Sequence, residues 1–363
     1  MSGYTGVAVV DLDTPALVVD LDAMDRNITR MTRVFREAGV AWRPHTKGIK
    51  VPAIAHRLLD AGAIGVTCAK VSEAEVMVAA GIRSVLIANQ VVGEYKVRRL
   101  ASLCRWADVM SAVDHPENIR QMGSIAREAG VRVGVLIEVN IGMNRCGVEP
   151  GEPALELAKV VRDTEGLVFK GLMGWEGHTQ RVEDPGEKLR AVGAAVGALR
   201  RSAEICRQAG IPVEIVSCGG TGTYRQTAVQ PGVTEIQAGG GVWGDMYYHG
   251  TGAESEFALT VLTTVTSRPA PTRVVADAGK KTMSSDVAAP KPRDLHGVTK
   301  VRLSAEHCTL ELERPVEAPR VGDKLTFIVG YSDTTVCLHD VLFGARNGVV
   351  EVAWPILGRG KLQ

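Results

Sequence analysis

From about residue 12 to residue 250, short apolar runs alternate with longer segments whose apolar side chains recur at helical spacing. The first such segment begins at Leu21, and Met24, Ile28 and Phe35 would lie on one face of its helix. Gly39 follows the last apolar position and is well suited to end that helix. The pattern therefore predicts a chain in which strands and amphipathic helices alternate.

Eight of the apolar runs have the length of strands, and helical segments separate them. The expected strands are 40–45, 64–68, 84–88, 109–113, 131–140, 167–174, 213–217 and 234–238, and the helices between them include 51–61, 71–80, 116–129, 153–163 and 188–209. Eight alternations predict an α/β fold with a (β/α)8 TIM-like barrel over residues 21–252. An open doubly wound sheet is the alternative, but no GxGxxG turn follows the first strand.

After about residue 255 the pattern changes to short strands, often with alternating polarity, separated by turn residues. They are expected at 259–265, 273–276, 298–303, 309–312, 324–329, 341–345 and 349–354, with Asn347-Gly348 as a hairpin turn. The run 16–19 precedes the first helix and is expected to join them. The sequence thus predicts a β domain of residues 253–363 together with 1–20, in which 288–295 forms an exposed loop.

Charge and cysteine usage narrow the possible partners and location. The net charge is +1 and no lysine or arginine run is dense, which argues against nucleic acid and anionic membranes as partners. No apolar run reaches the roughly 20 residues of a membrane span, and the N-terminus lacks a signal-peptide pattern. Seven scattered cysteines without a CxxC pair are typical of reduced thiols, so we expect a cytoplasmic protein.

Lys47 is expected at the carboxyl end of the first barrel strand, where such barrels carry their active sites. A lysine amine there can form a Schiff base with an aldehyde cofactor. Two glycine-rich turns, Gly219-Gly220-Thr221-Gly222 and Gly239-Gly240-Gly241, follow the seventh and eighth strands, where barrels commonly bind phosphate. Either turn alone is more often just a tight turn, but together with the lysine they predict pyridoxal phosphate.

Other polar side chains stand at strand ends. Arg145 follows the fifth strand, among asparagine and glycine residues that indicate a constrained loop. Trp175, after the sixth strand, could cap the barrel or line a cofactor pocket, and His178 could be a general base or a solvated loop residue. Strand alternation puts His45 on the same face as Lys47, so we assign it to the pocket. Three side chains after the second glycine turn could bind substrate or only support the structure: Asp245, Tyr247 and Tyr248.

These residues together resemble the fold-type III pyridoxal-phosphate enzymes, and among them the D-threonine aldolase, D-3-hydroxyaspartate aldolase and D-serine dehydratase family. The barrel resembles the N-terminal domain of alanine racemase. The matching strings are 13–20, 43–47, 70–75, 145–148, 175–178, 219–222, 235–239, 277–279, 306–307, 338–340 and 354–355. They keep the family's order along nearly the whole chain.

The resemblance implies roles for the residues singled out above. Lys47 would carry the cofactor, Arg145 would contact its phenolic oxygen, and the turns 220–222 and 239–241 would hold its phosphate. The resemblance also implies an amino-acid substrate and a homodimer in which the β domain of one subunit closes the active site of the other.

One departure from the family concerns a divalent metal. Aldolases and dehydratases of this family carry a His-x-Asp or His-x-Cys pair just before the string at 338–340, and its metal grips the substrate β-hydroxyl. This chain has Tyr331-Ser332-Asp333 instead, and a carboxylate plus a phenol is a poor site for Mn²⁺, Mg²⁺ or Zn²⁺. Other departures are Gly48-Ile49 where Thr-His is common, Trp175 where tyrosine is common, and Gly240-Gly241 where Ser-Tyr is common.

The resemblance favours a lyase that cleaves or dehydrates a D-β-hydroxy amino acid, with retro-aldol cleavage giving glycine and an aldehyde. His178, or Tyr331 with Asp333, would take the hydroxyl proton. An amino-acid racemase or epimerase using Lys47 and Tyr331 is the alternative, because residues 330–333 resemble a Gly-Tyr-x-Asp run of alanine racemases. A non-catalytic pyridoxal-phosphate carrier is a third hypothesis, and the long β domain argues against it.

Overall fold

The computed structural model describes residues 2–363 and divides into two compact units. The barrel unit comprises residues 30–47, 52–239 and 361–363, and the β unit comprises residues up to 29, 48–51 and 240–360. Helix α1 (Leu21–Ala38) therefore begins in the β unit and ends in the barrel unit. The domain boundary at residue 252 stays a prediction of the sequence.

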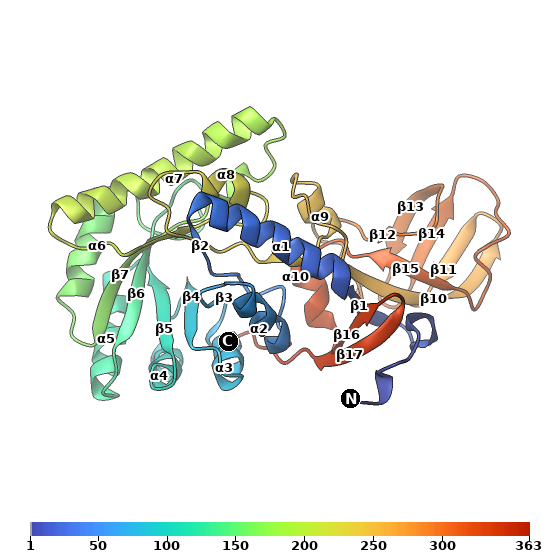
Figure 1. Cartoon of the computed structure of the whole chain (residues 1–363), viewed down its shortest axis with the longest axis horizontal. Coiled ribbons are helices and arrows are strands. Elements are labelled where there is room, and N and C mark those ends of the chain that lie inside the picture. Colours follow the sequence, from blue (N-terminus) through green and yellow to red (C-terminus); the bar gives the residue numbers. More distant parts are fainter. Residues whose placement is uncertain (1) are drawn as a thin grey trace. The chain divides into compact units, whose positions relative to one another are not determined.

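Eight parallel strands form the sheet of the barrel unit, in the order β2-β9-β8-β7-β6-β5-β4-β3. Figure 1 shows the part of this order from β7 to β3. The eight strands are β2 (Ala41–Trp42), β3 (Val66–Cys68), β4 (Ser84–Gln90), β5 (Asp108–Val113), β6 (Val133–Glu138), β7 (Leu167–Met173), β8 (Ile215–Cys218) and β9 (Glu235–Ile236). A parallel bridge between His45 and Thr67 joins the two ends of this order, so the sheet closes on itself. The predicted barrel and its eight strands are confirmed.

Helices follow the strands of the barrel and bury their apolar faces. They are α2 (Pro52–Asp60), α3 (Val71–Ala79), α4 (Glu94–Leu103), α5 (Pro116–Glu128), α6 (Glu152–Arg162), α7 (Pro185–Gln208) and α8 (Tyr224–Ala228). In α1, the apolar positions that predicted the helix are buried, Ile28 and Phe35 among them. The hydrophobic period thus gives each helix its orientation on the sheet.

A buried ion pair lies within the barrel. The Nε atom of Arg43 lies 3.0 Å from the Glu235 carboxylate, and both side chains are almost fully buried. Ser217 donates a hydrogen bond of 2.8 Å to Glu235, and Arg43 donates one of 2.8 Å to Ser84. Buried charges are stable only when they are paired and hydrogen-bonded in this way.

The β unit contains a nine-stranded sheet in the order β13-β14-β11-β10-β1-β16-β17, with β15 paired to β10 and β12 paired to β15. Its strands are β1 (Ala16–Asp20), β10 (Leu259–Ala270), β11 (Arg273–Ala276), β12 (Lys291–Pro292), β13 (Val298–Leu303), β14 (Cys308–Leu312), β15 (Lys324–Ile328), β16 (Val341–Arg346) and β17 (Val349–Pro355). As predicted, β1 joins this sheet, antiparallel to β10 and parallel to β16. Val18 packs there with Leu262 and Val350 in a buried cluster.

The expectation of an exposed loop over residues 288–295 is wrong at its centre. Lys291 and Pro292 form strand β12, which pairs antiparallel with β15, and Pro292 is buried. Proline lacks a backbone N–H and cannot donate a hydrogen bond to a neighbouring strand. It is tolerated in β12 because this strand pairs with β15 alone and lies at an edge of the sheet.

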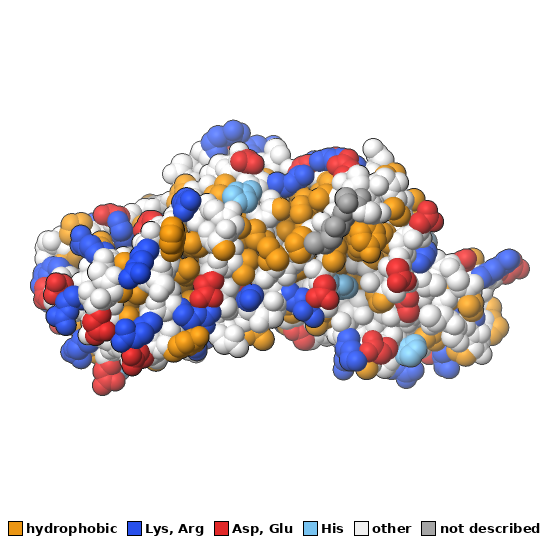
Figure 2. Space-filling view, turned by 90° about the horizontal axis from the view of Figure 1, so that it is seen from below, with side chains coloured by type: hydrophobic (Ala, Val, Ile, Leu, Met, Phe, Trp, Pro, Cys, Tyr) orange, Lys and Arg blue, Asp and Glu red, His pale blue; other side chains and the backbone are white. Residues whose placement is uncertain are grey.

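Lysine, arginine, aspartate and glutamate side chains are interspersed over the face shown in Figure 2. This mixture agrees with the net charge of +1 and offers a long polyanion no broad positive field on that face. Within residues 2–363, none of the helices has the length and apolar character that crossing a bilayer requires.

Candidate functional site

Lys47, Arg145 and Trp175 come together in the barrel unit, from the segments that follow β2, β6 and β7. The half-buried Lys47 has its Nζ atom 5.8 Å from the centroid of the Trp175 ring. The Arg145 guanidinium carbon lies 5.0 Å from the same ring. Cation–π attraction favours both contacts, so the indole fixes the two positive charges near each other at the carboxyl ends of the strands.

The loop that carries Arg145 is held in shape by Asn140. The side-chain oxygen of Asn140 accepts hydrogen bonds from the backbone N–H groups of Gly142 at 3.2 Å and Asn144 at 3.0 Å. Asn144 adopts a left-handed φ of 52°, which asparagine tolerates better than most residues. Arg145 itself is half exposed and lies 3.7 Å from the buried Glu138 carboxylate. The constrained loop that the sequence indicates is therefore present.

Glu176 is a site residue whose role the sequence does not reveal. Its carboxylate is fully buried and accepts hydrogen bonds from the Gly219 N–H at 3.2 Å, Thr223 Oγ1 at 2.7 Å and Thr227 Oγ1 at 2.5 Å. It therefore ties the first glycine turn and α8 to the end of β7. A carboxylate directly after a strand, beside Trp175, was the only sequence signal for this role.

The first glycine turn packs closely against Trp175. A β-carbon added to Gly220 would lie 2.8 Å from Trp175 Nε1, so a side chain there would displace the indole. Gly219 has a φ of 84°, a conformation in which glycine is strongly preferred. Thr221 is buried within the same turn, which ends at Gly222 just before α8. The turn thus lies against the ring that also contacts Lys47.

His45 connects the segment before Lys47 to the second glycine turn. Its backbone N–H donates to the Gln237 carbonyl at 2.9 Å, and its Nδ1 accepts a bond of 3.3 Å from the Lys47 N–H. A β-carbon at Gly239 would overlap the His45 carbonyl oxygen. His45 therefore positions the backbone of Lys47, and the close approach requires glycine at 239.

His178 is exposed and packs against the Arg145 loop. A β-carbon on Gly142 would lie 2.5 Å from its Cε1 atom, so the imidazole covers that glycine. Its role as a general base stays a prediction.

In the β unit, Tyr331 and Asp333 form a hydrogen-bonded pair at the start of α10 (Ser332–Thr335). The Tyr331 hydroxyl donates to Asp333 Oδ2 at 2.9 Å. The rings of Tyr247, Tyr248 and Tyr331 pack edge to face, with centroids 5.0 to 5.7 Å apart. Burial, and after it the Asp333 charge, raises the pKa of Tyr331, so the phenol holds its proton.

Asp245 holds the backbone around this cluster. The fully buried carboxylate accepts hydrogen bonds from the Tyr248 N–H at 2.7 Å, the Ser332 N–H at 2.8 Å and Ser332 Oγ at 2.7 Å. It therefore caps both α9 (Met246–His249) and α10. Burial raises the pKa of Asp245 to about 6.

The side chains around Asp333 do not fit a metal centre. Among residues 2–363, no three or more histidine, cysteine, aspartate or glutamate side chains are grouped so that they could hold a metal ion. Asp333 Oδ2 accepts a hydrogen bond from a protonated phenol, which is a weak ligand for divalent cations. The candidate Mn²⁺, Mg²⁺ or Zn²⁺ site at Asp333 is therefore not supported.

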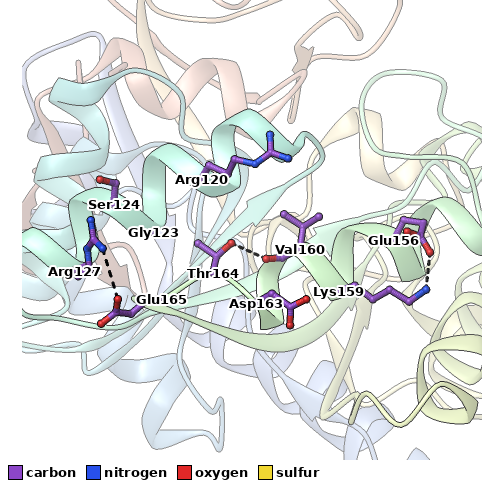
Figure 3. A pocket seen from close by; sticks show the side chains of 10 residues that line it. All are labelled: Arg120, Gly123, Ser124, Arg127, Glu156, Lys159, Val160, Asp163, Thr164 and Glu165. Carbon is purple, nitrogen blue, oxygen red and sulfur yellow. Dashed lines mark hydrogen bonds and ion pairs between the residues drawn. The ribbon is translucent and has the colours of Figure 1, made fainter.

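A hollow between α5 and α6 is not a second candidate site (Figure 3). Two ion pairs lie among its side chains: Lys159 with Glu156 at 2.6 Å, and Arg127 with Glu165 at 3.7 Å. Thr164 and Glu165 lead into β7, so the hollow lies at the amino ends of the strands, where barrels carry stability and not catalysis.

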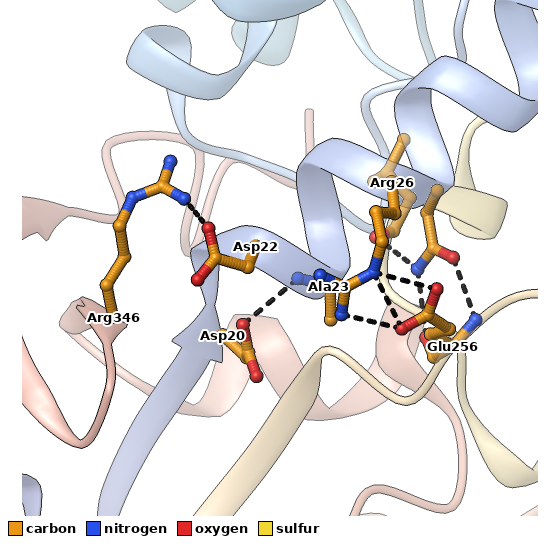
Figure 4. A network of polar contacts seen from close by, with 8 residues as sticks. Asp20, Asp22, Ala23, Arg26, Glu256 and Arg346 are labelled. Atoms are coloured by element: carbon orange, nitrogen blue, oxygen red, sulfur yellow. Dashed lines mark hydrogen bonds and ion pairs between the residues drawn. The ribbon is translucent and has the colours of Figure 1, made fainter.

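A charged network in the β unit is likewise structural (Figure 4). Arg26 in α1 binds Glu256 at 2.7 Å. Arg346 in β16 binds Asp22 and, at 2.6 Å, Asp25. A third carboxylate, that of Glu351, lies 3.4 Å from Arg346 Nε. These pairs fix the first turns of α1 to the sheet.

Known proteins match both parts of the chain. Residues 19–246 match the family model described as alanine racemase, N-terminal domain, and residues 258–345 match the putative serine dehydratase domain. The chain is 36% identical to D-threonine aldolase from Arthrobacter sp, covering 98% of this chain and 95% of that protein. It is 34% identical to 3-hydroxy-D-aspartate aldolase from Paracoccus denitrificans strain Pd 1222, covering 98% and 94%. The crystal structure of D-threonine aldolase from Filomicrobium marinum matches with a TM-score of 0.96 at 38% identity, over 99% of each chain.

Proposed function

Since the chain belongs to the fold-type III family of these aldolases, as its sequence motifs predict, we propose that it is a pyridoxal-phosphate-dependent lyase acting on D-β-hydroxy amino acids. Retro-aldol cleavage to glycine and an aldehyde is the reaction we favour, and dehydration is the alternative within this class. The observation that carries the proposal is Lys47, at a strand end of the barrel, against Trp175 and beside a glycine turn built for close approach.

The residues around Lys47 fit pyridoxal phosphate. Lys47 offers the amine for a Schiff base and Arg145 a cation for the phenolic oxygen. The turns 219–222 and 239–241 would hold the phosphate through backbone N–H groups other than those of Gly219 and Gly220, which donate to Glu176 and Thr223. Glu176 holds the first turn in shape without a ligand, which lowers the entropy lost on binding. When bound, the cofactor supplies an electron sink for the bond broken at the substrate Cα.

The chain's own side chains then divide the remaining tasks. Lys47 Nζ can hold and return a proton, and the indole face of Trp175 covers one side of the ammonium group. Arg145 adds a second positive charge on the same ring, which favours an anionic substrate. Two candidates remain for the proton of the β-hydroxyl: His178 and the Tyr331–Asp333 pair.

The proposal extends to assembly and location. We propose a homodimer with shared active sites, which the family resemblance implies, and a cytoplasmic location, which the seven dispersed cysteines support.

A substrate panel tests the proposed reaction. Purified protein loaded with pyridoxal phosphate is given D-threonine, D-3-hydroxyaspartate, D-serine and both enantiomers of alanine. We expect glycine and an aldehyde from D-threonine or D-3-hydroxyaspartate. Solvent deuterium at Cα without an aldehyde would instead identify a racemase, and bound cofactor without any turnover would identify a carrier.

A lysine pair tests the cofactor attachment. Lys47→Ala should lose the visible absorbance of lysine-bound cofactor, whereas Lys70→Ala should keep it. Lys70 is a matched control because it also follows a barrel strand, β3. Absorbance retained in Lys47→Ala would refute the assignment of Lys47.

A further inference from the structure

Three side chains of the β unit pack into one cluster. The Tyr248 and Tyr331 rings lie edge to face with their centroids 5.7 Å apart, and the Tyr331 hydroxyl donates to Asp333 Oδ2 at 2.9 Å. Tyr248 is buried, and Asp245 fixes the backbone beside the cluster through the Tyr248 N–H and the Ser332 N–H. The cluster is therefore a built structure and not a chance surface contact.

Two glycines leave the space in which side chains of this cluster lie. A β-carbon on Gly48 would overlap Asp333 Oδ1, and a β-carbon on Gly240 would overlap the ring of Tyr248. Neither glycine has a left-handed φ, so the backbone conformation does not require glycine at these positions. The absence of a side chain at Gly48 leaves space that Asp333 fills, and its absence at Gly240 leaves space that Tyr248 fills.

The family resemblance implies threonine, serine and histidine as the common residues at positions 48, 240 and 331. Here glycine at 48 and 240 leaves room for Asp333 and Tyr248, and Tyr331 donates to Asp333. A packed and hydrogen-bonded cluster therefore stands where the resemblance implies a metal ligand.

Two other polar side chains of the β unit are already hydrogen-bonded. The Asp245 carboxylate accepts three hydrogen bonds, and His339 Nε2 lies 2.9 Å from the Thr282 carbonyl oxygen. A divalent cation at Asp333 would have to displace the phenol proton that binds Oδ2. Phenol oxygen is a weak ligand unless it is deprotonated, so hydrogen bonding is the favoured use of this pair.

We propose that this protein binds no divalent metal at Asp333, and that Tyr331 and Asp333 bind the β-hydroxyl of the substrate by hydrogen bonds in its place. The inference rests on the proposed function for the identity of the substrate. A substrate hydroxyl can insert between the two side chains: it accepts the proton that Tyr331 now donates to Asp333 Oδ2, and it donates its own proton to the Asp333 carboxylate.

Manganese binding tests the metal part directly. Mn²⁺ is titrated into EDTA-treated holoenzyme and its free fraction is followed by electron paramagnetic resonance. We expect no stoichiometric binding, and D-threonine cleavage within twofold of the untreated enzyme. One bound Mn²⁺ per chain, or cleavage that falls tenfold with EDTA and returns with Mn²⁺, would overturn the inference.

Reversal of the substitutions tests the assigned position. Tyr331→His creates a His-x-Asp pair. A double variant adds Gly48→Thr, the residue that the family resemblance implies at that position. We expect at least one of Tyr331→His and the double variant to gain Mn²⁺ binding, with an unchanged circular dichroism spectrum. Failure of both folded variants to bind Mn²⁺ would show that position 331 does not decide metal use, and the inference would fall.

Tyr331→Phe tests hydroxyl binding. Loss of one hydrogen bond to a charged group should lower kcat/KM for D-threonine about tenfold to a hundredfold. Deuterium exchange at Cα of glycine, which has no β-hydroxyl, should stay within twofold. Exchange lost together with cleavage would contradict hydroxyl recognition and favour a role of Tyr331 at Cα. If the wild type cleaves no β-hydroxy amino acid, the proposed function fails, whereas the Mn²⁺ titration still judges the metal part alone.

Discussion

Glu176 offers the sharpest test of how the cofactor turn is held. Glu176→Ala removes a fully buried acceptor of three hydrogen bonds. Thr227 can turn to the Thr223 carbonyl at 3.1 Å, so its loss is partly offset, but the Gly219 N–H is left without its acceptor. At about 1 kcal/mol for each hydroxyl and about 1–3 kcal/mol for an unsatisfied buried N–H, we expect the variant to lose about 3–5 kcal/mol of stability.

Two further measurements make this test specific. Glu176→Gln keeps the volume and two acceptor lone pairs but turns an NH₂ group toward one donor, so it should lose about 1–3 kcal/mol. Urea unfolding of the apoprotein followed by circular dichroism gives the stabilities, and a fluorescence titration gives the Kd for pyridoxal phosphate, which should rise about tenfold in Glu176→Ala. Glu204→Ala on the exposed face of α7 is the control. A Glu176→Ala variant within 1 kcal/mol and twofold in Kd of wild type would refute the reasoning.

Three other outcomes are expected. Gly220→Ala would place a β-carbon 2.8 Å from Trp175 Nε1. The Kd of this variant for pyridoxal phosphate, measured by equilibrium dialysis, should therefore rise at least as much as in Glu176→Ala, and an unchanged Kd would contradict the close packing. Burial raises the pKa of Asp245 to about 6, so the folded protein keeps a proton that the unfolded chain releases near pH 4. The stability relative to Asp245→Asn should therefore fall by about 2 kcal/mol between pH 4 and 7 in urea unfolding, and a rise would reverse the assigned sign. Arg43→Met should lose about 3–5 kcal/mol because it leaves the Glu235 carboxylate buried and unpaired, and the double variant with Glu235→Leu should recover much of it; equal thermal stability of the two variants would show that the pair is not coupled.

Much of the fold follows from the spacing of apolar residues alone. The period of α1 and the apolar runs of the eight strands were sufficient for the barrel, because each element must bury one face. Strand ends were less well predicted: the run 131–140 gives only β6, since Asn140 turns its side chain to the following loop. Helix α4 is harder to read because Val97 and Leu100 stand among charged residues.

From the sequence, only those site residues could be grouped that follow neighbouring parallel strands. Lys47, Arg145 and Trp175 could be grouped because parallel strands end at the same edge. The partners of Glu176 are 43 to 51 residues away, and no local pattern indicates which distant hydroxyls a buried carboxylate will meet. The close approach of Asp333 to Gly48 could not be predicted either. The sequence does not show whether a glycine is needed for its backbone conformation or for the space that it leaves to a distant side chain.

The indole beside Lys47 gives this protein an optical reporter of its own. Lysine-bound pyridoxal phosphate absorbs where tryptophan emits, so excitation energy from Trp175 would pass efficiently to a chromophore attached 5.8 Å from its ring. The difference in emission between the wild type and Trp175→Phe would then isolate this one indole among the five tryptophans. Loading, substrate exchange and release could thus be followed in real time without a label.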